Sequence, residues 1–272
     1  MKSRLARAAV YVAFLSLLVY VFAPYLWLIF ASLSPKANLQ LRLPDKVTLE
    51  NFAEAFSGLT LRWIRNSFVL SLSVTLINVL VTTPGGYALS RGSFRGKSVL
   101  MYGIILTRII PTTLIIVPLY GIMLGLRLLD TYTGLILVEA GVAVPFSLWI
   151  MKGAIDAVPL ELEEAAEIDG ASRLRILFSL ILPLVAPGLG AVSVMSFVGA
   201  WGGFVMPLIL LSTTSKYPIS VGVFTAFGVQ GEVDFANLAT LCLSYMLPVI
   251  ILYLTLGSYF QRGLGTLGSG DR

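Results

Sequence analysis

The chain has 272 residues, of which 57% are hydrophobic and only 12% charged, and its mean hydropathy is +0.90. A soluble domain of this size has too little interior to bury so much apolar surface, so the composition excludes a water-soluble globular fold and indicates a protein of the lipid bilayer. With no histidine and one cysteine, Cys242, the chain cannot build a His/Cys metal site, a Ser/His/Asp triad or an intrachain disulfide.

Apolar stretches separated by short charged clusters predict membrane-spanning helices, because about 20 apolar residues are needed to cross roughly 30 Å of hydrocarbon. The first stretch follows three cations and is too long for the core of a signal peptide, so we expect it to be retained. A short interfacial helix is predicted within residues 48–59, where Phe52, Phe56 and Leu59 share one face. The six predicted spans are 8–33, 66–89, 99–123, 134–155, 181–211 and 238–261.

The loop cations indicate the orientation, because lysine and arginine resist translocation across a membrane. A cytoplasmic N-terminus places most of the 19 lysines and arginines inside, and an even number of spans then returns the C-terminus to the same side. No basic run is interleaved with aromatic residues, so the net charge of +5 reflects topology and no nucleic-acid partner is expected. The predicted fold class is an all-α integral membrane protein, with residues 1–272 forming one domain of six spans.

Prolines in the predicted spans favour a transport pathway over a static anchor. Most of the 13 prolines lie in or at the edges of the spans, and each removes a backbone hydrogen bond. The carbonyl groups that are freed at membrane depth are tolerated when they are buried in protein or face a water-filled cavity. Ordinary packing kinks are the alternative at any single proline.

Residues 156–180, between the fourth and fifth predicted spans, are far more acidic than any other loop. Pro159 suits a helix start, the run LELEEAAEI is a good helix former with acids in its first turns, and Gly170 can end the helix in a left-handed conformation. The run RLRILFSLIL then resumes a helix toward the membrane. The sequence therefore predicts a helix, a sharp turn and a second helix outside the bilayer, with small residues available to a partner's groove.

This acidic segment resembles the EAA loop of the inner-membrane permeases of ABC importers. The residues that match its spacing are Glu164, Ala165, Ala166, Gly170, Leu182 and Pro183. The stretches NSFVLSLSVTL, GGYALSRGSFRGK, RIIPTTLIIVPLYGIM and QRGLGTL look like the maltose-type branch, the carbohydrate permeases. The chain departs from the branch after Trp201, where Gly202-Gly203 stand in place of a frequent polar pair.

The resemblance implies the type I permease fold of ABC importers, in which the EAA segment is the coupling helix seated in a cleft of a cytoplasmic ATPase. Glu164 is expected to pair with a cation of that ATPase, and small residues permit its close approach. The implied coupling residues are Glu164, Ala165, Ala166, Asp169, Gly170, Leu182 and Pro183. The implied partners are a second homologous permease, two copies of the ABC ATPase and an external solute-binding protein, in a bacterial or archaeal cytoplasmic membrane.

The chain contains no G-x-x-x-x-G-K-[ST] phosphate loop, so it is expected to have no enzymatic activity of its own. ATP and Mg²⁺ are expected to bind the partner ATPase, and no cofactor or metal is expected in this chain.

Charged and aromatic side chains in the predicted spans are candidates for the solute pathway. Arg108 and Glu139 are the deepest ionisable residues, and charge at such depth is costly enough to suggest function. They could pair with each other. Alternatively, Arg108 extends its charged end toward the membrane interface or bonds the carbonyl groups freed by Pro111, and Glu139 lies near the outer interface. Because flat aromatic faces bind sugars but also anchor proteins at membrane interfaces, the further candidates are Trp149, Trp201 and Tyr245.

The outer loop after the fifth span is long and polar at its tip. In maltose-type permeases the corresponding loop contacts the docked binding protein, and a passive connection is the alternative. The residues to which the resemblance extends this role are Gln230, Gly231, Glu232 and Asp234.

The predicted function is the permease subunit of an ATP-driven importer for a sugar or sugar-like solute, with a di- or oligosaccharide favoured over glycerol phosphate or a polyol. A secondary transporter would need intramembrane acids for ion coupling, and only Glu139 offers one. A membrane-embedded enzyme would have to use the carboxylates of 161–169, which lie on different helix faces and have no metal-ligand signature.

Overall fold

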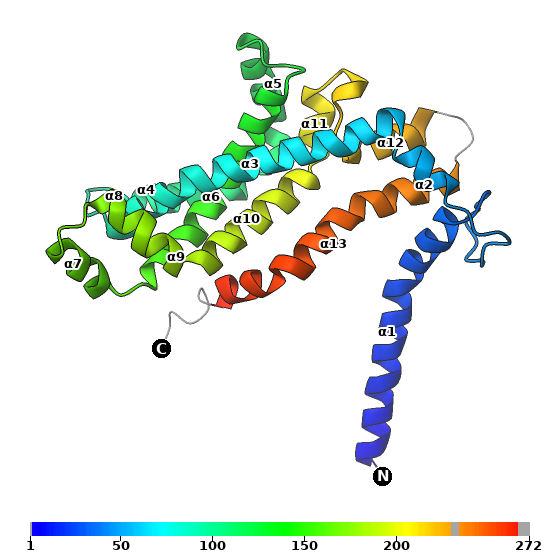
Figure 1. The fold of residues 1–272 in the computed structure, drawn as a ribbon, viewed down its shortest axis with the longest axis horizontal. Coiled ribbons are helices and arrows are strands. Elements are labelled where there is room, and N and C mark those ends of the chain that lie inside the picture. The colour runs from blue at the N-terminus through cyan, green and yellow to red at the C-terminus, as the bar shows by residue number, and fades with distance from the viewer. Residues whose placement is uncertain (1, 230–233, 266–272) are drawn as a thin grey trace. The chain divides into compact units, whose positions relative to one another are not determined.

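The structure is a computed structural model that describes residues 2–229 and 234–265, and every regular element in these ranges is a helix (Figure 1). The chain divides into one unit of Met1–Arg62 with Gly222–Pro248 and a second of Trp63–Val221 with Val249–Arg272. Four helices are long and apolar enough to span a bilayer, and two bent helix pairs bring the number to six if each pair is one span. The expectation of an all-helical membrane protein is confirmed.

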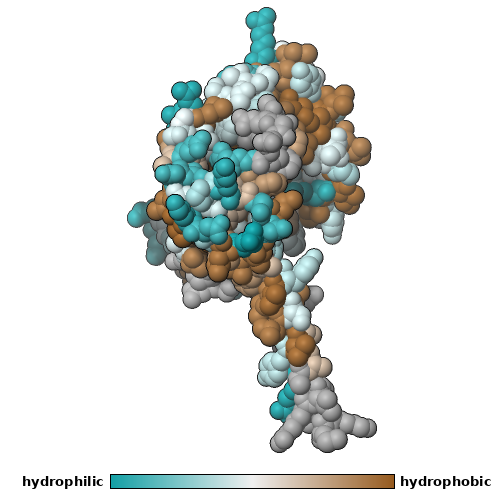
Figure 2. Space-filling model, turned by 90° about the vertical axis from the view of Figure 1, so that its right-hand side faces the viewer, coloured by the Kyte–Doolittle hydropathy of each residue, from teal (hydrophilic) through white to brown (hydrophobic). Residues whose placement is uncertain are grey.

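The first unit contains helix α1 (Lys2–Ser32), helix α2 (Glu50–Ala55) and the beginning of helix α13 (Phe235–Gly265). Large apolar side chains are exposed along α1, as Figure 2 shows, and a helix that is apolar on all sides belongs in lipid or against a partner. The predicted interfacial helix is present as α2, where Asn51 donates hydrogen bonds to the carbonyl oxygens of Ser32 (2.8 Å) and Ser34 (2.9 Å). These bonds fix α2 beside the end of α1.

The second unit is built around helix α6 (Tyr132–Asp156) and helix α10 (Ala186–Trp201), which pack along each other. Their interface holds the main buried cluster, in which Met151 and Ile155 of α6 meet Ala191 and Val192 of α10. Helix α3 (Gly58–Arg91) contributes the third central helix of this unit. Helix α12 (Ile219–Val229) begins here and continues into the first unit.

One buried amide joins the three central helices. Asn78 of α3 donates hydrogen bonds from Nδ2 to the hydroxyl of Ser147 on α6 (2.7 Å) and to the hydroxyl of Ser196 on α10. All three side chains are buried. Because lipid offers no competing water, such interhelical hydrogen bonds help to specify which helices pack together.

The predicted span 99–123 is broken at Pro111. Helix α4 (Lys97–Leu106) and the short helix η1 (Thr107–Ile109) are bent by 100° from helix α5 (Thr112–Gly125). Pro111 has no backbone N–H and disfavours a helical conformation in the preceding residue, so Ile110 is extended with ψ 116°.

The predicted span 181–211 is broken twice instead of forming one helix. Helix α8 (Arg173–Ile176), the π-helix η2 (Leu177–Ile181) and helix α9 (Leu182–Leu184) are bent by 79° from α10, next to two prolines. The second break comes after Trp201, where Gly202-Gly203 separate α10 from helix α11 (Val205–Leu210). The short helix η3 (Thr214–Lys216) follows.

Asp130 clamps the loop before α6 to η3. Its carboxylate accepts hydrogen bonds from the backbone N–H groups of Ser212 and Thr213 (3.0 Å each) and lies 2.7 Å from Lys216 Nζ. Its backbone has a left-handed φ of +54°. Burial alone would raise the pKa of Asp130, but the hydrogen bonds from Lys216 and Thr213 hold it well below its ordinary value.

We expect Ser196→Ala to lower the free energy of unfolding by about 1 kcal/mol, because it removes the hydrogen bond from Asn78. Ser193→Ala is the matched control, since Ser193 bonds only to a carbonyl oxygen of its own helix, a bond that Ser196 also makes. Unfolding of the purified variants by titration with dodecyl sulfate measures both. Equal losses in the two variants would contradict the role of the Asn78 amide.

The Asp130 clamp predicts a pH dependence of stability. Because its folded pKa is depressed, its contribution is present above the ordinary aspartate pKa of about 3.9 and is lost as the pH falls below that value. Asp130→Asn should therefore melt at a lower temperature than the parent at pH 7, and the difference should shrink below about pH 4. Asp45→Asn, at an exposed aspartate, is the control. A gap that stays constant from pH 7 to pH 3 would rule out the clamp.

Candidate functional site

The acidic segment forms a compact helical hairpin at the end of the second unit (Figure 1). Helix α7 (Leu160–Ile168) starts directly after Pro159, and Glu161 and Glu163 lie in its first turn. Acidic side chains are favourable there because the first turn exposes unpaired N–H groups and the positive end of the helix dipole.

Gly170 ends α7 in the predicted left-handed conformation, with φ +80°. The N–H of Gly170 donates to the carbonyl oxygen of Glu167, and the N–H of Ala171 donates to that of Ala166, both at 3.0 Å. This pair of bonds is a Schellman motif, which satisfies carbonyl groups at the helix end. Helix α8 then begins after Ser172, so the prediction of helix, sharp turn and helix is confirmed.

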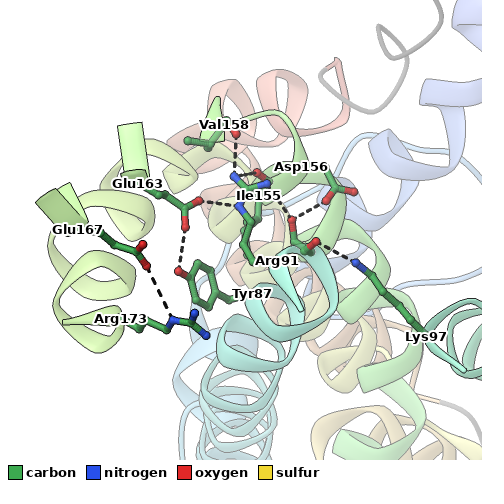
Figure 3. A network of polar contacts seen from close by, with 10 residues as sticks. Tyr87, Arg91, Lys97, Ile155, Asp156, Val158, Glu163, Glu167 and Arg173 are labelled. Atoms are coloured by element: carbon green, nitrogen blue, oxygen red, sulfur yellow. Dashed lines mark hydrogen bonds and ion pairs between the residues drawn. The ribbon is translucent and has the colours of Figure 1, made fainter. Parts of the chain in front are cut away.

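A buried ion pair holds α7 against the rest of the second unit (Figure 3). Arg91, the last residue of α3, places Nε 2.6 Å from Oε1 of Glu163 on α7, and the two side chains are only 19% and 6% exposed. The same guanidinium donates from Nη2 to the carbonyl oxygens of Ile155 (3.1 Å) and Val158 (2.7 Å). The hydroxyl of Tyr87 donates to the other oxygen of Glu163 (2.8 Å). This arrangement, the Arg91–Glu163 pair, therefore ties together α3, the end of α6 and α7.

Further polar contacts surround the pair. Ser90 donates to a carboxylate oxygen of Asp156 (2.5 Å), which also pairs with Lys152 one turn earlier on α6. One turn further along α7 and beside the same groove, Glu167 lies 3.8 Å from Arg173 in an exposed ion pair. Lys97 donates to two carbonyl oxygens at the end of α3, at 2.9 and 3.0 Å.

The expected coupling residues lie where a partner can reach them. Glu164, Ala165, Asp169 and Gly170 are exposed, and Ala166 is half-buried against the core of the second unit. Beside them lies a groove of about 490 Å³, whose lining includes Tyr87, Arg91, Phe94, Glu163, Glu164 and Arg173. Leu182, half-buried, and Pro183, exposed, belong to α9, after the π-helix.

Sequence reasoning missed Arg91 and Glu163. It favoured Glu164, which the structure leaves exposed, whereas the preceding carboxylate is the one buried in an ion pair. The available signal was the arginine at the cytoplasmic end of GGYALSR, together with acids in the first turn of α7. Nothing in that signal indicates which acid faces the arginine.

Arg108 and Glu139 line one cavity of about 330 Å³ between η1, α5, α6 and α10. They are not joined in an ion pair in the part of the chain that the structure describes. The guanidinium of Arg108 instead lies over the ring of Phe146, 5.4 Å from its centre. The Oε2 atom of Glu139 is buried and accepts no hydrogen bond.

The three aromatic candidates have different surroundings. Trp201 is 1% exposed, and its ring packs against Phe68 and Phe197, so we assign it to packing. Trp149 is exposed and stacks on Phe146, and Tyr245 is half-buried on α13.

The predicted binding-protein contacts Gln230, Gly231 and Glu232 lie outside the described residues. Asp234 is exposed and accepts hydrogen bonds from the backbone N–H groups of Ala236 (3.0 Å) and Asn237 (3.1 Å). It therefore caps the start of α13.

The pattern of the binding-protein-dependent transport system inner membrane component family matches residues 82–266, which is more than half of the chain. The chain belongs to this family. It is therefore a membrane component of a transport system that works with a binding protein, and it is not an enzyme in its own right.

Individual relatives agree with this membership. The maltodextrin transport system permease protein MdxG of Bacillus subtilis (strain 168) is 32% identical over 86% of this chain and 84% of that protein. The galactooligosaccharides transport system permease protein GanQ of the same strain is 30% identical over 92% and 91%. A chain of a bacterial ABC transporter involved in the import of the acidic polysaccharide alginate matches with a TM-score of 0.83 at 22% identity, over 96% of this chain and 98% of that chain. The last likeness shows that the ABC importer permease fold is shared.

Glu163→Gln should loosen α7, because removing one member of a buried ion pair leaves its partner uncompensated at a cost of about 3–5 kcal/mol. We expect hydrogen exchange of the amides of 160–168 to become roughly a hundredfold faster in this variant. Glu167→Gln is the matched control on the same helix, since its ion pair is exposed and is worth about 0–1 kcal/mol. Equal exchange in the two variants would show that the Arg91–Glu163 pair does not hold the hairpin.

Proposed function

We propose that this chain is one of two homologous permease subunits of an ATP-driven importer for di- or oligosaccharides, coupled to the ATPase through α7. The observation that carries the coupling role is that α7 presents the EAA residues to solvent while the Arg91–Glu163 pair fixes the helix to the ends of α3 and α6. Glu164 is exposed for pairing with an ATPase cation. ATP and Mg²⁺ bind that partner.

The geometry suggests how a force on α7 reaches the pathway. Arg91 binds Glu163, the carbonyl oxygen of Ile155 in the last turn of α6 and that of Val158 in the following link. Therefore α7 cannot shift without moving the ends of α3 and α6 or breaking several charge-assisted bonds. Closure of the ATPase dimer around ATP would displace α7 and reorient the helices that line the cavity. A change from a 1:99 to a 99:1 population requires about 5.5 kcal/mol of differential binding, which the nucleotide supplies.

The proposed assembly places six spans of this chain in a bacterial cytoplasmic membrane, with both termini on the cytoplasmic side. The two bent helix pairs count as one span each, which agrees with the loop cations. A second permease, two ATPase copies and an external solute-binding protein complete the importer. The solute class rests on the relatives, whose names specify maltodextrin and galactooligosaccharides.

A pull-down of the tagged chain from its native membrane in mild detergent, with mass spectrometry of the associated proteins, tests this function. We expect an ABC ATPase and a second permease, and ATP-dependent uptake of a neutral oligosaccharide by the purified complex. Repeated recovery of the chain alone, with uptake that does not require ATP, would favour a secondary transporter instead.

Gly170→Pro should abolish transport and ATPase association while the chain still inserts into the membrane. Proline cannot adopt φ +80° and has no N–H for the bond to the Glu167 carbonyl, so the turn after α7 is lost. Gly170→Asn is the matched control, since asparagine tolerates the left-handed conformation and should retain most activity. The pull-down and uptake assays measure both variants, and unimpaired uptake with proline would exclude the coupling role of the hairpin.

A further inference from the structure

A helix break and a cavity coincide in the second unit. Irregular backbone at membrane depth is tolerated where it is buried in protein or lines a water-filled cavity. Arg108, Thr112 and Thr113 flank the 100° bend between α4 and α5, and all three line the cavity of about 330 Å³. This volume falls at the lower end of ligand pockets, which measure about 300–1,000 Å³. The break therefore supplies polar groups to a space large enough for a small solute.

Glu139 reaches this cavity from α6, and its carboxylate lies beside Gly203, which has no side chain. A Cβ atom at Gly203 would lie 2.6 Å from Oε1 of Glu139, closer than non-bonded atoms approach, and 3.1 Å from the carbonyl oxygen of Ala200, which is a tight contact. Gly203 is one of the two glycines that replace the polar pair of the maltose-type branch. The carboxylate thus occupies the space next to the backbone where a side chain of residue 203 would begin.

The carboxylate has no partner within the described protein. Its Oε2 atom is buried without a hydrogen bond, although each buried polar group normally finds one. An unpaired carboxylate at membrane depth is costly and needs a donor. Four other buried oxygens of the described residues also lack a partner, on Ser71, Asn78, Thr82 and Thr83, but none of these residues lines the cavity. Glu139 does line it, so a bound molecule can supply the missing donor.

We propose that this cavity is a solute-binding site in which Glu139 accepts hydrogen bonds from the hydroxyl groups of an uncharged, polyhydroxylated solute. The inference rests on the proposed function and adds a contact residue and the charge of the solute.

The charges in the lining favour an uncharged solute. An anionic solute would meet the carboxylate of Glu139, and a cationic one would meet the guanidinium of Arg108 in the same cavity. A neutral sugar ring carries hydroxyl groups that both donate and accept, so it can satisfy Glu139 as well as Arg108 and the threonine hydroxyls. Apolar side chains in the lining, among them Met195 and Phe204, can contact the C–H faces of a sugar ring.

Cysteine accessibility tests the cavity without knowledge of the solute. Cys242 is the single cysteine of this chain, so Cys242→Ala gives a permease subunit without thiols, whose labelling is read on its own band after separation of the subunits. In the assembled transporter, Glu139→Cys should react with the anionic reagent sulfonatoethyl methanethiosulfonate at least tenfold faster than Leu135→Cys. Leu135 lies one turn earlier on α6 and is 0% exposed. A Glu139→Cys thiol that does not react with the reagent, either with or without ATP, would overturn the proposal.

Uptake by the complete importer in liposomes tests the contact, with maltotriose, arabinotriose and chitobiose as the neutral probes. For each probe that the parent transports, Glu139→Ala should raise KM about tenfold, and Glu139→Gln should raise it less, because the amide keeps one acceptor oxygen. The melting temperature should not fall, because both substitutions remove a buried carboxylate that has no partner. If the melting temperature falls while KM is unchanged, Glu139 has a structural role and the proposal is wrong.

Gly203→Ala provides the sharpest check, because its Cβ displaces the carboxylate. The increase in KM should match that of Glu139→Ala, and the double variant should be no worse than either single variant, since both act through one group. Additive increases in KM in the double variant would show that Gly203 does not act through Glu139, and would contradict the proposed role of Gly203. If the parent complex transports none of the probes, the proposed function of sugar import is wrong. If the parent transports them and the Glu139 variants have an unchanged KM, only the proposed solute contact is wrong.

Discussion

The Arg91–Glu163 pair is the contact that ties the acidic hairpin to the long helices of the second unit. It lies where α3, the end of α6 and the start of α7 meet, and it is largely shielded from water. A buried ion pair adds little net stability, because desolvation offsets most of the attraction, but breaking one is expensive. Such a pair therefore determines the orientation of α7 more than it adds to the stability of the fold. It fixes which face of α7 turns inward and leaves Glu164 and Ala165 turned outward.

The second unit uses buried polar groups in two opposite ways. Asn78 donates to two serine hydroxyls on two other helices, so its amide nitrogen is satisfied within the fold and its role is to specify packing. Glu139 has a buried oxygen with no donor, although it stands on the same helix as Ser147. The Oδ1 atom of Asn78 also lacks a hydrogen bond, so an unpaired oxygen alone does not mark a binding residue. Glu139 differs from Asn78 because it also lines the cavity of about 330 Å³, where a bound molecule can reach it.

The sequence predicted the helical class, the four unbroken apolar helices and the acidic hairpin, because each depends on local pattern: apolar length, capping residues and Gly170. The positions of the breaks depend on tertiary surroundings. Pro111 ends a helix, whereas Pro84 and Pro145 lie inside continuous helices, although all three remove the same backbone bond. Likewise, Glu163 is buried because an arginine 72 positions away in the sequence faces it. No local sequence pattern encodes this long-range contact.

The two candidate sites share α6, which makes a mechanical connection between them direct. Glu139 stands in the cavity, and the carbonyl group of Ile155 accepts a hydrogen bond from Arg91 at the far end of the same helix, about 24 Å away at 1.5 Å per residue. Pro145 lies between them and leaves the helix without one of its backbone hydrogen bonds. A helix weakened at one point transmits displacement and can also bend there. Movement of α7 would therefore alter the surroundings of Glu139 through a single continuous element, with no need for a chain of side-chain rearrangements.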